Sequence, residues 1–302
     1  MMCRRRIHYR ALVNTAMKEM QNTKLNYPTR IRHIFLVFLL FLGFLPACQR
    51  TTQFPFSFVQ LCDPQLGMGG YEHDKESLSQ AVHLINEMEC DFVVVCGDLV
   101  HHAADSSFQD FLDITGALEM PCYLVAGNHD VGNIPDDSTL TYYREELGDD
   151  YYAFKYGGHA FVVVNTQLWK NPVEGESARH EKWFRKVLDD LTGRQIPVIV
   201  VGHHPLFVEK ANEEEAYFNL PLEKRTELLQ IFTESGVVAY LSGHKHETLI
   251  NNYQDILLVT GESTSRNFDE RPLGFRLWEV DGDSLRHRFV ALTSPSHVTV
   301  NE

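Results

Sequence analysis

The apolar residues from position 54 onward follow two different periods. Short continuous runs rich in Val, Ile, Leu and Phe predict buried strands, and the stretches between them carry apolar residues at spacings of three and four, which is typical of amphipathic helices. One helix is predicted after Asp74, its expected N-cap, from the positions Leu78, Ala81, Val82, Ile85 and Met88. Two more are predicted over residues 178–191 and 222–235, and Gly236 is expected to end the second of these. This alternation of strands and helices indicates an α/β protein.

Five of the apolar runs end in the same way, with a polar residue that can bind a metal ion or transfer a proton. These endings are Asp63, Asp98, Asn128, His203 and His244. A glycine directly precedes each of the last four, and glycine lets the backbone turn sharply beside a ligand. In open α/β sheets, ligands bind beyond the carboxyl ends of the strands. The five endings therefore predict one shared site.

Charge divides the chain into two parts. Residues 1–53 hold nine of the 27 Lys and Arg but one of the 41 Asp and Glu, which leaves 18 basic and 40 acidic residues in the remainder, a formal charge of -22. A field of that sign repels polyanions, so a nucleic acid is excluded as a partner. The ordinary hydrophobic fraction of 44% indicates a globular core. We predict one domain over residues 54–292 and a short tail over residues 293–302.

The basic segment resembles an export signal. Residues 34–45 form an apolar run behind Arg30 and Arg32 that is shorter than the roughly 20 residues of a membrane-spanning helix. The following Leu-Pro-Ala-Cys48 is similar to the lipobox of bacterial lipoproteins. We therefore expect a leader over residues 1–48, lipidation of Cys48 and anchoring to the membrane of a bacterial envelope. The alternative is that Cys48 only lies near a signal-peptidase site.

The cysteines beyond the leader show no spacing of a zinc site. Cys62, Cys96 and Cys122 stand in apolar strand-like runs, and Cys90 follows a predicted helix. Buried cysteine behaves as a small apolar residue, so packing in the core is expected in preference to disulfides.

The order of the motifs resembles a known family. D-x-Q, G-D, G-N-H-D, H-x-P and G-H-x-H follow one another as in the calcineurin-like metallophosphoesterases, and less generic stretches, such as residues 126–133 and 215–220, are similar to the CPPED-type phosphatases within it. The resemblance covers residues 54–292. It implies a four-layer α-β-β-α sandwich and an enzyme that hydrolyses phosphoric esters with a dinuclear metal centre.

The resemblance also implies a ligand set for two divalent or trivalent ions. Asp98 would bridge the ions, with the remaining ligands provided by Asp63, Gln65, Asn128, His203, His244 and His246. Mixed imidazole and oxygen ligands favour Mn, Fe, Zn or a similar ion over Ca. Gln65 departs from the superfamily, which usually has His there, but agrees with the CPPED-type pattern. An amide oxygen is a weaker donor than imidazole, so weaker binding of one ion is expected.

Other residues are expected beside the metals. By resemblance His129 contacts the leaving-group oxygen as a general acid, Asp130 shapes its loop or orients a neighbour, and His101 lies near the site. Asn165 and Gln167 either contact the substrate or cap the end of a strand. Substrate contact is also predicted for two residues of the segment that follows the His203 loop, Tyr217 and Asn219.

The function expected from the resemblance is hydrolysis of phosphomonoesters by a metal-activated water. A phosphorylated small molecule or a phosphopeptide with phosphoserine or phosphothreonine would be the substrate. Two alternatives stay open, a phosphodiesterase acting on nucleotides or lipid headgroups, and a catalytically silent surface lipoprotein that binds a partner. The expected ligands favour an enzyme over the silent protein.

Overall fold

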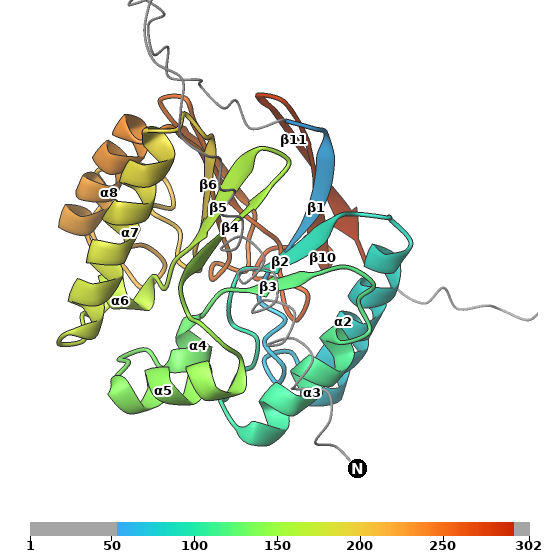
Figure 1. Ribbon diagram of the computed structural model, residues 1–302. Helices are drawn as coiled ribbons and strands as arrows, with labels where there is room; N and C mark the ends of the chain where they lie inside the picture. Colours follow the sequence, from blue (N-terminus) through green and yellow to red (C-terminus); the bar gives the residue numbers. More distant parts are fainter. Residues whose placement is uncertain (1–52, 293–302) are drawn as a thin grey trace, which may run out of the picture. The chain divides into compact units, whose positions relative to one another are not determined.

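Two β-sheets lie face to face in the part of the chain that the computed structural model describes, residues 53–292 (Figure 1). The first sheet has the order β11-β10-β1-β2-β3, with β1 at Phe56–Leu61, β2 at Phe92–Val95, β3 at Cys122–Leu124, β10 at Gly274–Asp281 and β11 at Ser284–Ala291. The second has the order β4-β5-β6-β7-β9-β8, with β4 at Tyr152–Tyr156, β5 at His159–Val163, β6 at Val198–Val201, β7 at Val237–Ser242, β8 at Leu249–Tyr253 and β9 at Ile256–Thr260.

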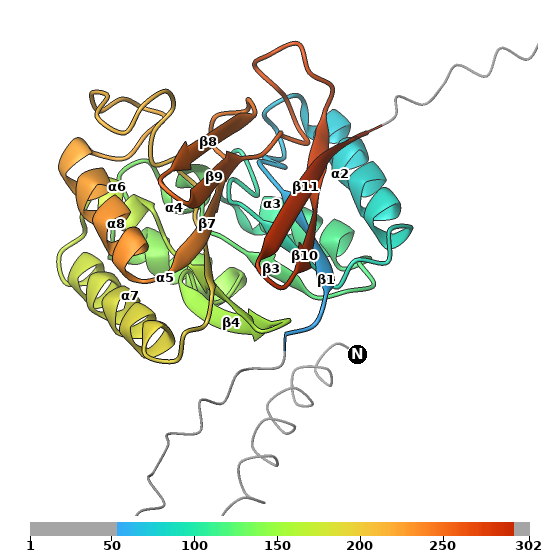
Figure 2. The same cartoon turned by 90° about the horizontal axis from the view of Figure 1, so that it is seen from above.

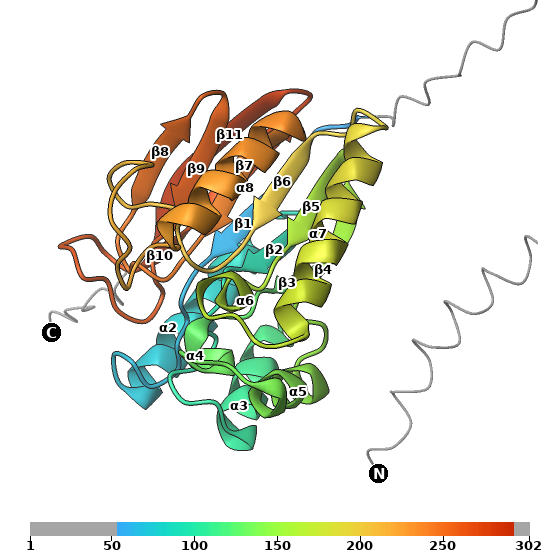
Figure 3. The ribbon, with the colours of Figure 1, turned by 90° about the vertical axis from the view of Figure 1, so that its left-hand side faces the viewer.

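Helices cover the outer face of each sheet (Figures 1 and 3). The helices of the first sheet's side are α2 at Tyr71–Asn86, α3 at Asp105–Thr115, α4 at Asn128–Val131 and α5 at Asp137–Glu146. Those of the second sheet's side are α6 at Gln167–Lys170, α7 at Glu176–Thr192 and α8 at Leu222–Glu234. The resulting order of helices, sheet, sheet and helices is the four-layer sandwich that the family resemblance implied, and Figure 2 shows the same layers from above.

The continuous apolar runs form strands because both of their faces are buried. In β2, Phe92 and Val94 pack between the two sheets, whereas Val93 and Val95 pack against α2 and α3. β6 divides in the same way, with Ile199 between the sheets. Strands β1, β2 and β3 are parallel, as are β5, β6, β7 and β9. Their carboxyl ends therefore gather the loops that carry the predicted site.

The helix predicted after Asp74 begins earlier than expected. α2 starts at Tyr71, so Asp74 is not the N-cap but lies within the first turn. Its buried carboxylate accepts hydrogen bonds from the backbone N–H groups of Gly67 and Gly69, each at 2.9 Å. The loop before the helix needs those acceptors, which explains the acidic residue. The ends of α7 and α8 agree with the sequence to within two residues.

A buried ion pair joins the two sheets behind the site. Arg276 of β10 donates to Glu262, which follows β9, at 2.6 Å, and the two side chains are 4% and 1% exposed. Thr248 also donates to the Glu262 carboxylate at 2.6 Å. Since an isolated buried charge is costly, each partner needs the other.

The remaining predictions about the fold concern the cysteines and the two terminal segments. Cys62, Cys90, Cys96 and Cys122 are free thiols, which confirms the prediction of core packing without disulfides. Within residues 53–292, no helix is long and apolar enough to cross a membrane. The predicted leader with Cys48 and the tail over residues 293–302 lie outside the described residues and stay predictions.

Candidate metal centre

Six of the predicted ligands lie on loops at the carboxyl ends of the parallel strands. The first sheet provides Asp63 after β1, Asp98 after β2 and Asn128 after β3. The second sheet provides His203 after β6, and His244 and His246 after β7. Every one of these residues is at most 3% exposed. Buried carboxylates and imidazoles at this density require a positive charge among them.

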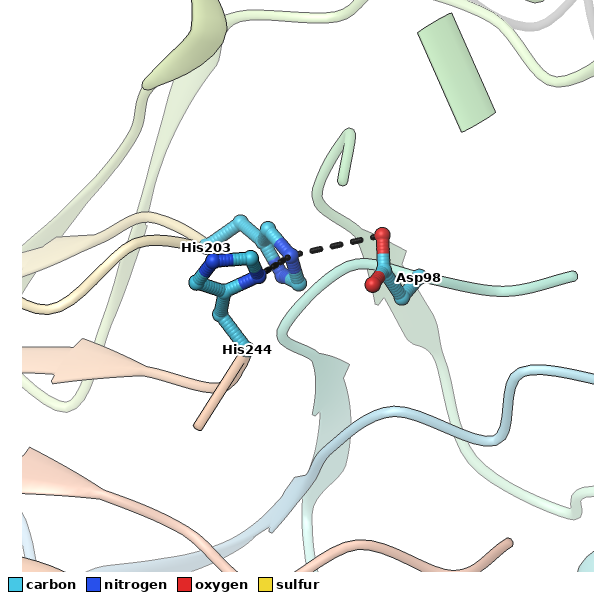
Figure 4. A group of neighbouring side chains, drawn as sticks. All are labelled: Asp98, His203 and His244. Carbon is cyan, nitrogen blue, oxygen red and sulfur yellow. Dashed lines mark hydrogen bonds and ion pairs between the residues drawn. The ribbon is translucent and has the colours of Figure 1, made fainter. Parts of the chain in front are cut away.

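The side chains form two groups with one shared member. Asp98, His203 and His244 offer ligand atoms that lie within 4.8 Å of one another, and so do Asp63, Asp98 and His246. Figure 4 shows the first group, in which the His203 imidazole points toward the Asp98 carboxylate. Asp98 belongs to both groups, as expected of a carboxylate that gives one oxygen to each of two ions.

Each histidine is held by a backbone carbonyl. His203 donates from Nδ1 to the carbonyl of Cys96 at 2.8 Å, His244 from Nε2 to that of Tyr217 at 3.1 Å, and His246 from Nδ1 to that of Arg266 at 2.5 Å. A carbonyl can only accept, so the bonded ring nitrogen carries the proton. The other nitrogen then presents its lone pair to the site, which is the usual arrangement of metal-binding imidazoles.

The atoms around the free nitrogen of His203 are all acceptors. Its Nε2 lies 3.0 Å from Asn128 Oδ1, 3.1 Å from His244 Nδ1 and 3.3 Å from Asp98 Oδ1. Burial alone would lower the pKa of His203, but the carboxylates of Asp98 and Asp63 raise it to about 9. Likewise, burial alone would raise the pKa of Asp98, and the charge of His203 holds it well below its usual range. A proton or a metal ion must fill this position, and the donor set fits a metal ion.

Five of the seven predicted ligand residues share an uncommon backbone conformation. Positive φ angles are found at Asp63 (48°), Gln65 (34°), Asp98 (50°), His244 (69°) and His246 (53°). Residues with a Cβ atom rarely adopt this left-handed conformation. Gly243 directly precedes His244, and the backbone there approaches Asp63 so closely that a Cβ atom at Gly243 would lie 2.6 Å from Asp63 Oδ2. The loops thus turn back sharply and aim their side chains at one point.

Gln65 occupies the position where the superfamily usually has His. Its backbone N–H donates to the carbonyl of Asp98 at 2.8 Å, and its side chain is 1% exposed. Nε2 lies 3.4 Å from His101 Nδ1, whereas the buried Oε1 has no hydrogen-bond partner among the described residues. A buried oxygen without a partner is unfavourable. An ion beside Gln65 would satisfy it, which supports the predicted ligand role.

His129 lies beside the Asp98 carboxylate. Its backbone N–H donates to Asp98 Oδ1 at 2.9 Å, and its ring donates from Nδ1 to the carbonyl of His101 at 2.9 Å. The rings of His101 and His129 stack with centroids 4.8 Å apart. Burial, together with the neighbouring histidines His129 and His102, lowers the pKa of His101. His129 Nε2 is therefore the ring atom left to face a reacting group.

Asp130 is used by the backbone of the loops. Its carboxylate accepts from the N–H groups of Leu99 at 2.9 Å, Val100 at 3.3 Å and Gly127 at 2.8 Å. These bonds tie the loop after β2 to the loop after β3. The Asp130 side chain therefore shapes the loops, which is the first of the two roles expected from the sequence.

Asn165 and Gln167 are buried and support neighbouring loops. Asn165 Oδ1 accepts from the N–H of Gln167 at 3.0 Å, and its Nδ2 donates to Asp150 at 2.8 Å. Gln167 Nε2 donates to the carbonyls of Gly132 at 2.8 Å and Asn133 at 3.0 Å. The capping alternative therefore holds for Asn165 in place of substrate contact. Gln167 likewise fixes the loop after α4.

Tyr217 and Asn219, the two remaining candidates, lie in the segment after the His203 loop but differ in exposure. Tyr217 is 49% exposed, its hydroxyl accepts from Asn128 Nδ2 at 3.2 Å, and its ring lies 4.8 Å from that of His244. Asn219 is 1% exposed and donates to Glu213 at 2.6 Å. It also accepts from the N–H of Ala216 at 2.7 Å. Tyr217 borders the site, whereas Asn219 holds the loop together in place of the predicted substrate contact.

The loop after β9 also lies at the site, although the motifs did not indicate it. Ser263 and Ser265 donate to the carbonyl of Asp63, and Phe268 stacks on His246. The signal was present, because the apolar run at residues 256–260 also ends in a glycine and polar residues. None of these is a typical metal ligand, which is why the run did not stand out.

Comparisons with known proteins agree with this geometry. The family model described as calcineurin-like phosphoesterase matches residues 57–248. The serine/threonine-protein phosphatase CPPED1 of Danio rerio is 34% identical over 275 residues, which cover 82% of this chain and 88% of that protein. The human protein of the same description is 31% identical, with 82% and 87% covered. A dimetal phosphatase structure from Danio rerio has the same fold, with a TM-score of 0.63, 15% identity, and coverage of 79% and 96%.

Proposed function

The chain belongs to the calcineurin-like phosphoesterase family, and from that premise we propose that it hydrolyses phosphomonoesters at a centre of two metal ions. The family model is described as a phosphoesterase, and the structural neighbour from Danio rerio as a dimetal phosphatase. The observation that carries the proposal is the common orientation of His203, His244 and His246. Each uses one ring nitrogen on a backbone carbonyl and turns the other toward buried carboxylates.

Each ion has its own ligands in this proposal. Asp63, Gln65 and His246 hold the first ion, whereas Asn128, His203 and His244 hold the second, and Asp98 contributes to both. When bound, such ions lower the pKa of a water molecule and neutralise the oxygens of a phosphate group. The protein's own part is to fix the ligands on strand ends, where the packed core allows little movement.

His129 supplies the proton for the leaving group. The carbonyl of His101 keeps its Nδ1 protonated and its ring in place. In the imidazolium form Nε2 also carries a proton, which it donates to the ester oxygen as the bond to phosphorus breaks, and the neutral ring that is left keeps its Nδ1 proton on the carbonyl of His101. Tyr217 borders the site at Asn128 and His244 and is the residue proposed to touch the substrate.

A small phosphate group suits this site better than a polymer. The acidic remainder of the chain repels polyanions, and screening over roughly 8 Å at physiological salt confines attraction to the immediate surroundings of the ions. The relatives named CPPED1 are described as serine/threonine-protein phosphatases, so phosphoserine and phosphothreonine peptides are the first substrates to test.

The test is a panel of matched phosphomonoesters and phosphodiesters assayed on metal-loaded protein. Chelation should abolish hydrolysis, and added Mn²⁺ should restore it. We expect a higher kcat/KM for the monoester of each pair. A tenfold preference for diesters, a difference of about 1.4 kcal/mol in transition-state stabilisation, would establish the phosphodiesterase alternative. No hydrolysis of any ester by the Mn²⁺-loaded protein would establish the silent binding protein.

We also propose that the protein is exported and anchored through Cys48. The support is the apolar run behind basic residues and the Leu-Pro-Ala-Cys sequence that ends it. Acyl chains contribute about 0.8 kcal/mol per buried CH₂, so a multiply acylated cysteine anchors a domain stably. Expression in a bacterium that processes lipoproteins should give a membrane-bound chain that begins at lipidated Cys48. Cys48→Ser should block lipidation, and an unprocessed cytoplasmic chain by intact mass would contradict the proposal.

A further inference from the structure

We propose that the loop over residues 261–268, here called the serine loop, sets how tightly the first of the two metal ions is bound. The inference rests on the proposed two-metal centre. The serine loop follows β9 and contributes no ligand, but it contacts Asp63 and His246, two of the three residues assigned to the first ion alone. Its residues are positioning residues that act through those two ligands.

The serine loop holds Asp63 by its carbonyl. The hydroxyls of Ser263 and Ser265 both donate to that oxygen at 2.9 Å, and the two serines are 0% and 2% exposed. The N–H of Thr264 donates to the carbonyl of Cys62 at 3.2 Å. Asp63 has a left-handed backbone that an isolated residue would leave readily. Two buried donors on its carbonyl stabilise that conformation and so fix the direction of the carboxylate.

The serine loop makes three contacts with His246. His246 Nδ1 donates to the carbonyl of Arg266 at 2.5 Å, and the N–H of Phe268 donates to the carbonyl of His246 at 2.9 Å. The Phe268 ring stacks on the imidazole with centroids 4.6 Å apart and an angle of 13° between the planes. Phe268 is nevertheless 44% exposed. The contact with the ligand His246 explains why such a large apolar side chain lies at the surface.

The ligands of the second ion are held by other segments. Among the described residues, the side-chain amide of Asn128 donates to Asn133 and Tyr217, and His244 donates to the carbonyl of Tyr217. His203 donates to the carbonyl of Cys96. The serine loop takes no part in these contacts, although the two halves of the site also meet where the N–H of His244 donates to the Asp63 carboxylate at 2.9 Å and where the loop after β7 carries both His244 and His246. A change in the serine loop should weaken one ion and leave the other.

The first ion is also the one that depends most on such support. Its Gln65 offers an amide oxygen in place of an imidazole, and an amide is the weaker donor for a transition metal. Residues that orient ligands typically change metal affinity by 10- to 100-fold when they are replaced. The serine loop, and not the ligand set alone, therefore determines whether one or two ions are bound at a limiting metal concentration.

The test is a Mn²⁺ titration of the metal-stripped full chain by calorimetry, with electron paramagnetic resonance to detect the coupled pair of ions. Phe268→Ala should raise one of the two dissociation constants about 10- to 100-fold and leave the other unchanged. Phe268→Tyr keeps a stacking ring and should behave as the original protein. Ser263→Ala combined with Ser265→Ala should raise the same constant through Asp63. Tyr217→Ala, the matched change on the opposite side, should raise the other constant.

Melting temperatures of the metal-stripped variants separate positioning from folding. Phe268→Ala should melt within a few degrees of the original chain, because the side chain lies at the surface. The proposal is overturned if Phe268→Ala leaves both constants unchanged or raises both equally. If the unmodified chain binds fewer than two Mn²⁺ ions, the two-metal centre itself is wrong and the role of the loop falls with it.

Discussion

Replacing His129 by Ala should separate proton transfer from metal binding. The change removes the ring but keeps the backbone N–H that donates to Asp98 at 2.9 Å. The loop of the bridging ligand is therefore preserved, and both ions should remain. A general acid typically contributes about 10²- to 10⁴-fold, which corresponds to about 2.7 to 5.4 kcal/mol of transition-state stabilisation.

The full loss applies only where the leaving group needs a proton. A serine alkoxide is a poor leaving group, so kcat for a phosphoserine peptide should fall through that whole range in His129→Ala. p-Nitrophenolate leaves without protonation, and its ester should lose no more than about tenfold. The assay compares kcat for the two esters and measures bound metal by mass spectrometry.

His101→Ala is the matched control. It removes the ring stacked on His129 but keeps the carbonyl that fixes the His129 tautomer. Its effect should therefore be much smaller and similar for both esters. An equal loss of the two esters in His129→Ala, or a loss of metal, would refute the general-acid role.

Four further predictions concern charge. The pKa of His203 is raised to about 9 when no metal is bound, so Mn²⁺ must displace a proton and its affinity should rise with pH up to about 9. Calorimetry in buffers of different ionisation enthalpy should detect the released proton. An affinity that does not depend on pH would contradict this expectation. A raised pKa stabilises the folded state below the ordinary value of 6.5, so the metal-free chain should lose stability from there to about pH 9. Arg276→Met leaves the carboxylate of Glu262 buried without its ion-pair partner and should lower the free energy of unfolding, measured by urea denaturation, by about 3–5 kcal/mol. Adding Glu262→Gln to Arg276→Met should recover part of that loss. If the single and the double variant are equally stable, the pair contributes little. Asp98→Asn removes the shared carboxylate and should lose both metal and activity, and retention of two ions would exclude the bridging role.

The sequence predicted the strands and the ligands because both depend on local patterns. Continuous apolar runs such as residues 92–95 can only be buried strands between two layers, and the polar residue after each run marks the edge where ligands gather. The start of α2 was wrong because Asp74 has the chemistry of an N-cap, but two glycine N–H groups of the preceding loop take its carboxylate.

The parts that could not be predicted depend on contacts between distant segments. Asn165 and Asn219 have side chains suited to binding phosphate. Only the fold shows that these side chains donate hydrogen bonds to Asp150 and Glu213. The serine loop acts on Asp63 from 200 positions away in the chain. Spacing along a sequence carries no information about such partners.

The left-handed backbone at five ligand positions has a consequence for how this enzyme can change. Each such residue costs on the order of 1 kcal/mol, so together they weaken the fold by about 5 kcal/mol, a large part of the 5–15 kcal/mol that holds a typical domain together. Glycine at Asp63, Asp98 or His244 would relieve that strain. Selection of this protein for thermal resistance alone would therefore favour variants that have discarded their ligands. A stabilised form that still works has to be sought elsewhere in the fold, with activity tested at every round.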